Sequence, residues 1–178
     1  AKDKIKAIKL TQRGKVAKIR GIALSSWLKD SKVSERMAQS CKEILRSKGY
    51  DVAIRTEYDT NAIQKGAALG IWAETTSGCL IGSDMPGRPG RSSERIGKQV
   101  AENLIQALKI RATVDKYLAD QLILYCALAE GISEYLIPEV TEHVDTNLWL
   151  VQEILGAKVE LKDNWVRIHG IGYKRGDS

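Results

Sequence analysis

The stretch Val16-Ala-Lys-Ile-Arg-Gly-Ile-Ala-Leu24 alternates apolar and polar residues and then becomes wholly apolar. A period of two that ends in an apolar run is typical of a strand entering a hydrophobic core. The segment that follows, 31–47, has the 3.6-residue period of a helix, with Ser31 or Ser34 as its N-cap and Gly49 as its stop. Together they predict a strand followed by a helix.

The same two periods continue through the rest of the first half. Residues 50–56 alternate, and 66–76 and then 79–81 continue the sheet. Residues 82–91 are rich in glycine and proline, with two arginines just ahead of a helix that starts at Ser92 or Ser93 and runs to about Leu108. They form either a phosphate-binding loop or a mobile connection. We prefer the mobile connection, because the segment has neither the GxxxxGK(S/T) nor the GxGxxG pattern.

The second half has the order helix, strand, helix, strand, strand. Helices and strands alternate in both halves, which predicts an α/β (α+β) fold whose sheets are covered by helix pairs. Two subdomains joined near residue 112 give the simplest account. The segments expected in this half are 114–129, 135–137, 147–155, 159–161 and 165–168.

Composition excludes several classes of protein. With 178 residues, 43% hydrophobic and 28% charged, the chain fits one domain or two small ones. No run of about eighteen apolar residues is present, so no membrane span is expected. The cysteines, Cys41, Cys79 and Cys126, form no CxxC pair, which argues against a zinc site or a disulfide framework. Buried free thiols in a reducing cytoplasm are expected instead.

Charge is unevenly distributed along the chain. Residues 1–20 hold eight Lys and Arg against one Asp, whereas residues 112–163 hold ten acids against three lysines. A basic portion suits a polyanion such as nucleic acid. A lysine-rich soluble surface explains the same charge equally well.

Three residues of the helix expected at 114–129 could bind a ligand. Tyr117 and Gln121 are four residues apart and share a helix face, with Asp120 beside them. A carboxylate among apolar neighbours lies at the helix edge or holds a cation. A solvent-exposed aspartate on an amphipathic helix is the alternative.

His143 is one of two histidines and is expected in a loop before the next helix, with Asp145 or Thr146 as the N-cap. The free N–H groups of a helix start favour an anion. A neutral imidazole there could attack phosphorus and form an N–P bond. A surface-loop histidine without a role is the alternative.

Several segments resemble the RNA 3′-terminal phosphate cyclase family, in order and spacing, over nearly the whole chain. These are Lys18-Ile-Arg-Gly21, Val33-Ser-Glu-Arg36, Pro86-Gly-Arg-Pro-Gly-Arg91, Tyr117-Leu-Ala-Asp-Gln-Leu122 and His143-x-x-Thr-Asn147.

The resemblance implies an ATP-dependent enzyme of the ligase class that converts an RNA 3′-phosphate into a 2′,3′-cyclic phosphate. A histidine takes AMP from ATP, passes it to the RNA 3′-phosphate, and the neighbouring 2′-hydroxyl displaces it. By this match His143 is the adenylated nucleophile and Tyr117 stacks on adenine. Asp120 holds a divalent metal, Mg or Mn, and Gln121 contacts the nucleotide.

The resemblance also implies a βαβαββ repeat with a four-stranded sheet and two helices, plus a smaller inserted α/β domain. Residues 1–17 end the preceding repeat, 18–112 form the insert, and 113–178 form the C-terminal repeat with the nucleotide site. Family members are about twice this length. We therefore expect the arginines that bind triphosphate to come from a missing N-terminal half, without which this chain is inactive.

Two other functions remain as alternatives. The family has a non-catalytic branch of binding proteins for ribosome assembly, which lacks the nucleophilic histidine. A small RNA-binding module built on the same α/β unit would bind RNA in a salt-sensitive way without ATP.

Overall fold

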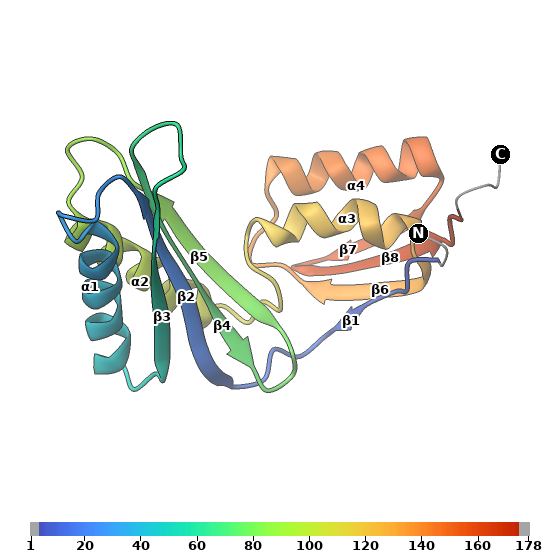
Figure 1. The fold of residues 1–178 in the computed structure, drawn as a ribbon. Helices are drawn as coiled ribbons and strands as arrows, with labels where there is room; N and C mark the ends of the chain where they lie inside the picture. Colours follow the sequence, from blue (N-terminus) through green and yellow to red (C-terminus); the bar gives the residue numbers. More distant parts are fainter. Residues whose placement is uncertain (1–3, 175–178) are drawn as a thin grey trace. The chain divides into compact units, whose positions relative to one another are not determined.

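The computed structural model describes residues 4–174 and has two four-stranded sheets and four helices, which confirms the mixed α/β class (Figure 1). The chain divides into two compact units. The central unit is Gly14–Lys109, and the flanking unit joins the residues up to Arg13 to those from Ile110 onward. The family resemblance implies these boundaries after residues 17 and 112. None of the helices within residues 4–174 has the length and apolar character needed to cross a membrane.

The central unit contains β2 (Val16–Ser26), α1 (Val33–Ser47), β3 (Val52–Asp59), β4 (Gly66–Thr75), β5 (Leu80–Pro86) and α2 (Ser93–Lys109). Its strand order is β3-β2-β4-β5, and both helices cover one face of the sheet (Figure 1). β2 and β3 are parallel, so their connection must be a crossover, which α1 supplies. β4 and β5 complete the sheet in antiparallel pairs.

The alternation in β2 decides which face of the central sheet is covered. Ile19 and Ala23 are completely buried in the core that α1 and α2 share, whereas Leu24 is 40% exposed. The two helices approach closely at Gly97, where an added Cβ would collide with the carbonyl oxygen of Met37. Glycine at this position is therefore what lets α2 pack against α1.

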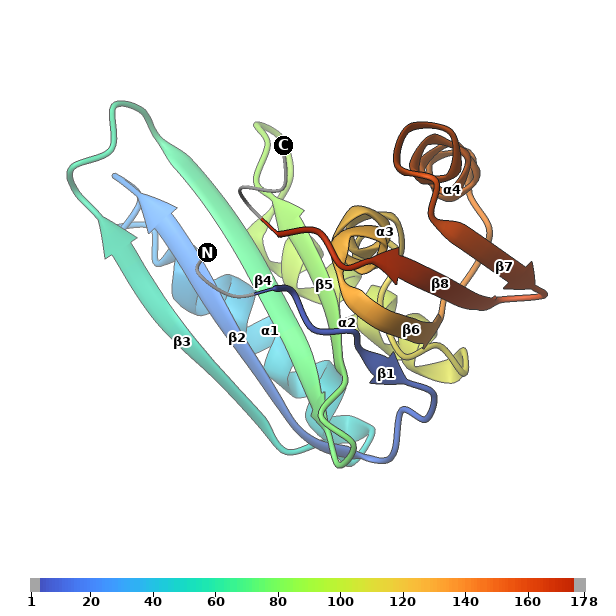
Figure 2. The same cartoon turned by 90° about the vertical axis from the view of Figure 1, so that its right-hand side faces the viewer.

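The flanking unit contains β1 (Lys9–Leu10), α3 (Leu118–Leu128), β6 (Glu130–Leu136), α4 (Glu142–Leu155), β7 (Lys158–Lys162) and β8 (Trp165–Ile171). Without the central unit, this order is the expected βαβαββ. The strand order is β1-β6-β8-β7, with β1 parallel to β6 (Figure 2). α3 leads directly into β6 and α4 follows it, so both helices run opposite to β6 and begin at the same end of one face (Figure 1).

Two helix starts in the central unit test the predicted caps. α1 has Lys32 at its N-cap, in a left-handed conformation without a side-chain bond, so Ser31 and Ser34 were wrong as caps. The hydroxyl of Ser34 is instead hydrogen-bonded to Ser25 Oγ, at 2.9 Å, and to the carbonyl of Glu57 in β3, at 3.0 Å. Ser92 does cap α2, because its Oγ accepts a hydrogen bond of 3.2 Å from the N–H of Arg95.

Other element ends differ from the prediction because strand pairing overrides local signals. β5 runs on to Pro86, paired with Ala68 of β4, through residues expected to form a loop. Gly131, which follows the helix expected at 114–129 and is its predicted stop, lies within β6 and pairs with Gly170 of β8. α3 begins at Leu118 rather than at residue 114.

Candidate functional site

His143 lies in the first turn of α4, not in a loop before it as the sequence predicts. Thr141 is the N-cap, and its Oγ1 accepts a hydrogen bond of 3.2 Å from the N–H of Val144. α4 therefore starts five residues before the predicted Asn147, and the expected caps were wrong. The missed signal was Thr141 itself, a good capping residue two positions before the histidine.

The surroundings of His143 combine helix-terminal N–H groups with negative charge. Its side chain is exposed, and the first turn of a helix carries N–H groups without intrahelical acceptors, which attract anions. Glu142 and Asp145 share this turn and stabilise the helix dipole. The same carboxylates would repel a polyphosphate, so additional cations are needed to bring a nucleotide to the imidazole.

Tyr117 occupies the N-cap position of α3, and the residue is 55% exposed. The carboxylate of Asp115 fixes this helix start, because its Oδ1 accepts hydrogen bonds of 3.0 Å from the N–H of Tyr117 and 2.9 Å from that of Leu118. The ammonium of Lys116 lies 4.8 Å from the centroid of the tyrosine ring. The local chain thus holds an aromatic ring at the surface, with the ammonium of Lys116 over one face.

Asp120, Gln121 and Asn147 line one groove of about 530 Å³ between α3 and α4. Both helices start at the same end of the sheet (Figure 1). The first turn of α3, with Asp120, and the first turn of α4, with His143, therefore both lie at that end. Tyr117 and His143 are not among the groove's lining residues. Of the four predicted site residues, the structure brings two into one groove and places the other two at the starts of the helices that form it.

Tyr135 supports the start of α3 from within the core. Its hydroxyl donates a hydrogen bond of 3.1 Å to the carbonyl of Ala119, next to Asp120. Burial raises the pKa of this phenol, and the nearby Cys126 and Asp120 raise it further. The phenol consequently stays protonated and anchors the turn that carries Asp120.

A divalent metal at this place would depend on the nucleotide for most of its ligands. Within residues 4–174 no group of three or more His, Cys, Asp and Glu side chains could hold a metal ion. Magnesium is commonly bound by one or two carboxylates plus substrate phosphates and water. Asp120 fits such a role as a single carboxylate ligand.

The groove also has exposed apolar residues that the sequence-based reasoning did not assign. Leu124, Tyr125 and Ile154 line it and are 50%, 58% and 73% exposed. A signal was available, because α3 carries apolar residues all round, which is typical of a helix covered on more than one side.

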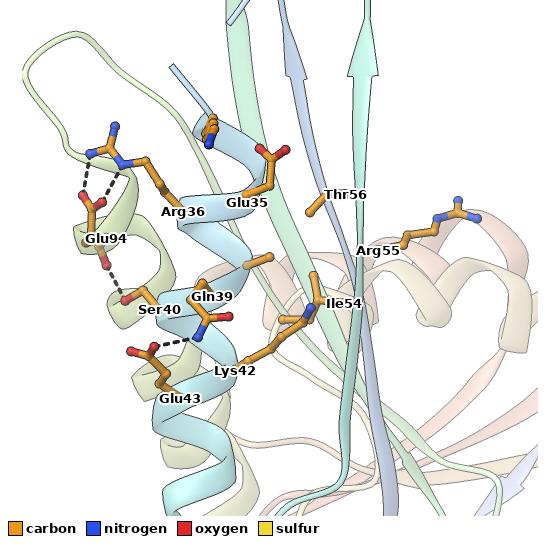
Figure 3. A pocket seen from close by; sticks show the side chains of 12 residues that line it. Glu35, Arg36, Gln39, Ser40, Lys42, Glu43, Ile54, Arg55, Thr56 and Glu94 are labelled. Atoms are coloured by element: carbon orange, nitrogen blue, oxygen red, sulfur yellow. Dashed lines mark hydrogen bonds and ion pairs between the residues drawn. The ribbon is translucent and has the colours of Figure 1, made fainter. Parts of the chain in front are cut away.

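A second groove, of about 770 Å³, lies between α1 and the edge strand β3 of the central unit (Figure 3). Arg36 forms two hydrogen bonds, of 2.6 and 2.9 Å, to the carboxylate of Glu94. These bonds lower the pKa of Glu94 and raise that of Arg36. Figure 3 shows Arg55 pointing away from α1. Arg36 and Glu94 satisfy one another, so these two charges are not available to a ligand in this groove.

Comparison with known proteins gives consistent matches. Residues 11–109 match the family model described as RNA 3′-terminal phosphate cyclase (RTC), insert domain. A curated protein named RNA 3′-terminal phosphate cyclase from Pyrobaculum aerophilum is 35% identical over 97% of this chain and 50% of its own length. Proteins of the same name from Pyrococcus abyssi and Thermococcus gammatolerans are 38% and 40% identical, over 85% and 73% of this chain and 43% and 37% of their own lengths. The chain spans about half the length of the curated relatives it matches, or less.

Proposed function

This chain belongs to the RNA 3′-terminal phosphate cyclase family, and from that premise we propose that it carries the nucleophile of an ATP-dependent cyclase. The substrate would be an RNA with a 3′-phosphate and the product a 2′,3′-cyclic phosphate. The observation that carries the proposal is the exposed His143 in the first turn of α4, beside a helix whose Asp120 and Gln121 line a groove.

The reaction would have three steps, and His143 would take part in the first two. Its imidazole attacks the α-phosphorus of ATP, an N–P bond forms, the bond to the β-phosphate oxygen breaks, and pyrophosphate leaves. An oxygen of the RNA 3′-phosphate then attacks the same phosphorus, which transfers AMP and frees the imidazole. Finally the 2′-hydroxyl attacks the 3′-phosphorus, loses its proton to water and expels AMP.

The other three residues would bind and orient the nucleotide. The exposed ring of Tyr117 suits stacking on adenine, since an aromatic face adds affinity without ordering a long flexible side chain. Gln121 can donate and accept hydrogen bonds to the nucleotide. Asp120 would bind Mg²⁺ or Mn²⁺, whose charge offsets that of the phosphates.

Catalysis would require residues beyond those of this chain. The chain spans about half the length of the matched relatives, and Glu142 and Asp145 surround His143 with negative charge. We propose that the other half of such a protein supplies the cations for the triphosphate and that this chain alone is inactive. We also propose a cytoplasmic location, because Cys41, Cys79 and Cys126 are buried free thiols.

The test is labelling with α-³²P-ATP and magnesium. We expect no label on this chain alone, but label once it is mixed with the half of the Pyrobaculum aerophilum protein that it does not match. His143→Asn should abolish the label, whereas His169→Asn, at the other histidine, should retain it.

Labelling that survives His143→Asn would exclude this residue as the nucleophile. Labelling of the chain alone would show that no second half is needed. The binding-protein alternative gains no support from the three relatives, since each is named a cyclase.

A further inference from the structure

The positive charge of this protein belongs to the central unit. Gly14–Lys109 contains 16 Lys and Arg against 10 Asp and Glu, whereas the remaining residues contain 12 of each. The formal net charge of +6 is therefore the charge of the central unit alone. A basic unit attracts polyanions whatever the flanking unit does.

Strand register brings three loops of the central unit to one end of its sheet. Ser26 at the end of β2 pairs with Asp59 at the end of β3 and with Gly66 at the start of β4. Pro86 at the end of β5 pairs with Ala68, two residues farther along β4. The connections 27–32, 60–65 and 87–92 consequently meet at this end, and we refer to them as the loop end (Figure 1).

Most of the excess positive charge is concentrated at the loop end. Its three connections carry five cations and a single acid, Asp30. Lys32, Lys65 and Arg88 form no ion pair within the part of the chain that the structure describes. The groove of Figure 3 shares Lys32 with the loop end, but its Arg36 is paired with Glu94. The cations of the loop end are Lys29, Lys32, Lys65, Arg88 and Arg91.

Trp27 presents a fixed aromatic ring at the same place. It is 52% exposed, although its Nε1–H donates a hydrogen bond of 2.7 Å to the carbonyl of Ala62 in the neighbouring loop. A second bond of 3.0 Å, from Ser26 Oγ to the carbonyl of Gln64, ties the same two connections together. The ring is thus restrained at one edge while much of its surface remains in solvent.

We propose that the loop end binds single-stranded RNA, with a base stacked on Trp27 and phosphates paired with the surrounding lysines and arginines. Stacking on an aromatic ring within a basic surface is how proteins hold single strands without reading sequence. An acidic protein is the alternative partner for a basic surface, but a protein–protein interface has an apolar centre. Here the exposed large apolar residues are only Trp27 and the tip residue Ile63 among the described residues of the loop end. The inference shares with the proposed function only the assumption that the ligand is RNA.

The first test measures the electrostatic part. The whole chain is titrated into a fluorescent single-stranded RNA of about ten nucleotides with a 3′-hydroxyl, and anisotropy is followed over a range of salt. Lys32→Gln is compared with Lys48→Gln, because these lysines flank the two ends of α1 and only Lys32 belongs to the loop end. Lys32→Gln should weaken binding and reduce the salt slope by about 0.7, the value for one single-strand phosphate contact. Lys48→Gln should change neither.

The second test isolates the ring of Trp27. Trp27→Phe and Trp27→Leu both lose the hydrogen bond to Ala62, but only phenylalanine retains an aromatic face. Trp27→Leu should weaken RNA binding at least about fivefold, and Trp27→Phe should weaken it less. Circular dichroism and the unfolding midpoint of both variants establish that the central unit is folded.

Equal effects of the two lysine variants, equal effects of Phe and Leu, or no RNA binding at low salt would each overturn the proposal. It would also be overturned if polyglutamate or vesicles with anionic headgroups bound as tightly with the same dependence on Trp27. The RNA lacks a 3′-phosphate and no ATP is present, so the result is independent of whether His143 is adenylated. A failure of adenylation therefore contradicts the proposed function and leaves this inference standing.

Discussion

The hydroxyl of Tyr135 joins β6 to the first turn of α3, because it donates to the carbonyl of Ala119. The side chain is completely buried, so its hydrogen bond has no competition from water. Asp120 follows Ala119 directly in the chain. The position of a candidate ligand-binding carboxylate on the surface thus depends on a buried residue that no ligand touches.

We predict that Tyr135→Phe lowers the free energy of unfolding by about 1 kcal/mol, the net contribution of one intramolecular hydrogen bond. Urea unfolding at neutral pH measures this difference. Tyr125→Phe is the matched control, because it removes the same hydroxyl oxygen from a tyrosine of α3 that is 58% exposed. Equal losses in the two variants would contradict the role given to the buried hydroxyl.

The same substitution should change the alkaline stability of the protein. Burial raises the pKa of Tyr135 above the ordinary tyrosine value of 10.0, so the folded chain keeps a proton that the unfolded chain loses. The free energy of unfolding must therefore fall as the pH rises through and above that ordinary value. In Tyr135→Phe this contribution is absent, so stability should fall less steeply with pH than in the unsubstituted protein.

At the scale of single residues, the sequence predicts which side chains could bind a nucleotide, but it does not predict where in its helix each one lies. The sequence nominates His143, Tyr117, Asp120 and Gln121 by residue type and by family resemblance. It puts His143 in a loop, because Asp145 and Thr146 are also good caps. The structure selects Thr141, since a helix from Glu142 buries Val144 in the core of the flanking unit.

Among the elements, the contact between α1 and α2 is the most sensitive to side-chain size. Alanine at Gly97 would favour the helix by about 1 kcal/mol through propensity alone. Its Cβ would nevertheless meet the carbonyl of Met37 and lie 3.0 Å from the backbone nitrogen of Cys41. Backbone atoms cannot move aside as the end of a side chain can.

We therefore predict that Gly97→Ala destabilises the central unit by about 1–3 kcal/mol, the usual cost of overpacking. Gly70→Ala is the control, because the nearest atom to its added Cβ is 3.9 Å away in Asp84. Urea unfolding of both variants tests the prediction. A stability gain in Gly97→Ala would mean that helix propensity outweighs the contact.

Over the whole molecule, the two units have separate hydrophobic cores. Leu104 is completely buried in the core of the central unit, and Ile168 in that of the flanking unit. Among residues 4–174, none belongs to both cores. Stability is expected to be divided in the same way, because the packing that opposes unfolding lies within each unit.

We predict that Leu104→Ala and Ile168→Ala each lower the free energy of unfolding by about 2–5 kcal/mol. Each substitution should destabilise only the unit that contains it. Amide hydrogen exchange distinguishes the two. Leu104→Ala should accelerate exchange in β2 and β4 and leave β6 and β8 unchanged, and Ile168→Ala should do the reverse. Accelerated exchange in both units from either substitution would show one cooperative structure.

The sequence by itself determined the mixed α/β class, most of the helices and strands and the family. Hydrophobic periodicity within a segment reports which face is buried, and this information is local. β2 and α1 illustrate it, since both follow the period that predicts them. Periodicity does not report what covers the buried face, so it leaves partners and element ends open.

The tertiary structure alone decided the pairings between distant segments. Lys9 and Leu10 form a strand because they pair with Glu134 and Tyr135, on the far side of the entire central unit in the sequence. Packing of α3 beside α4 brings Asp120 and Gln121 to Asn147, and strand register gathers three loops around Trp27. Each of these arrangements depends on contacts between segments far apart in the chain, and no local pattern encodes them.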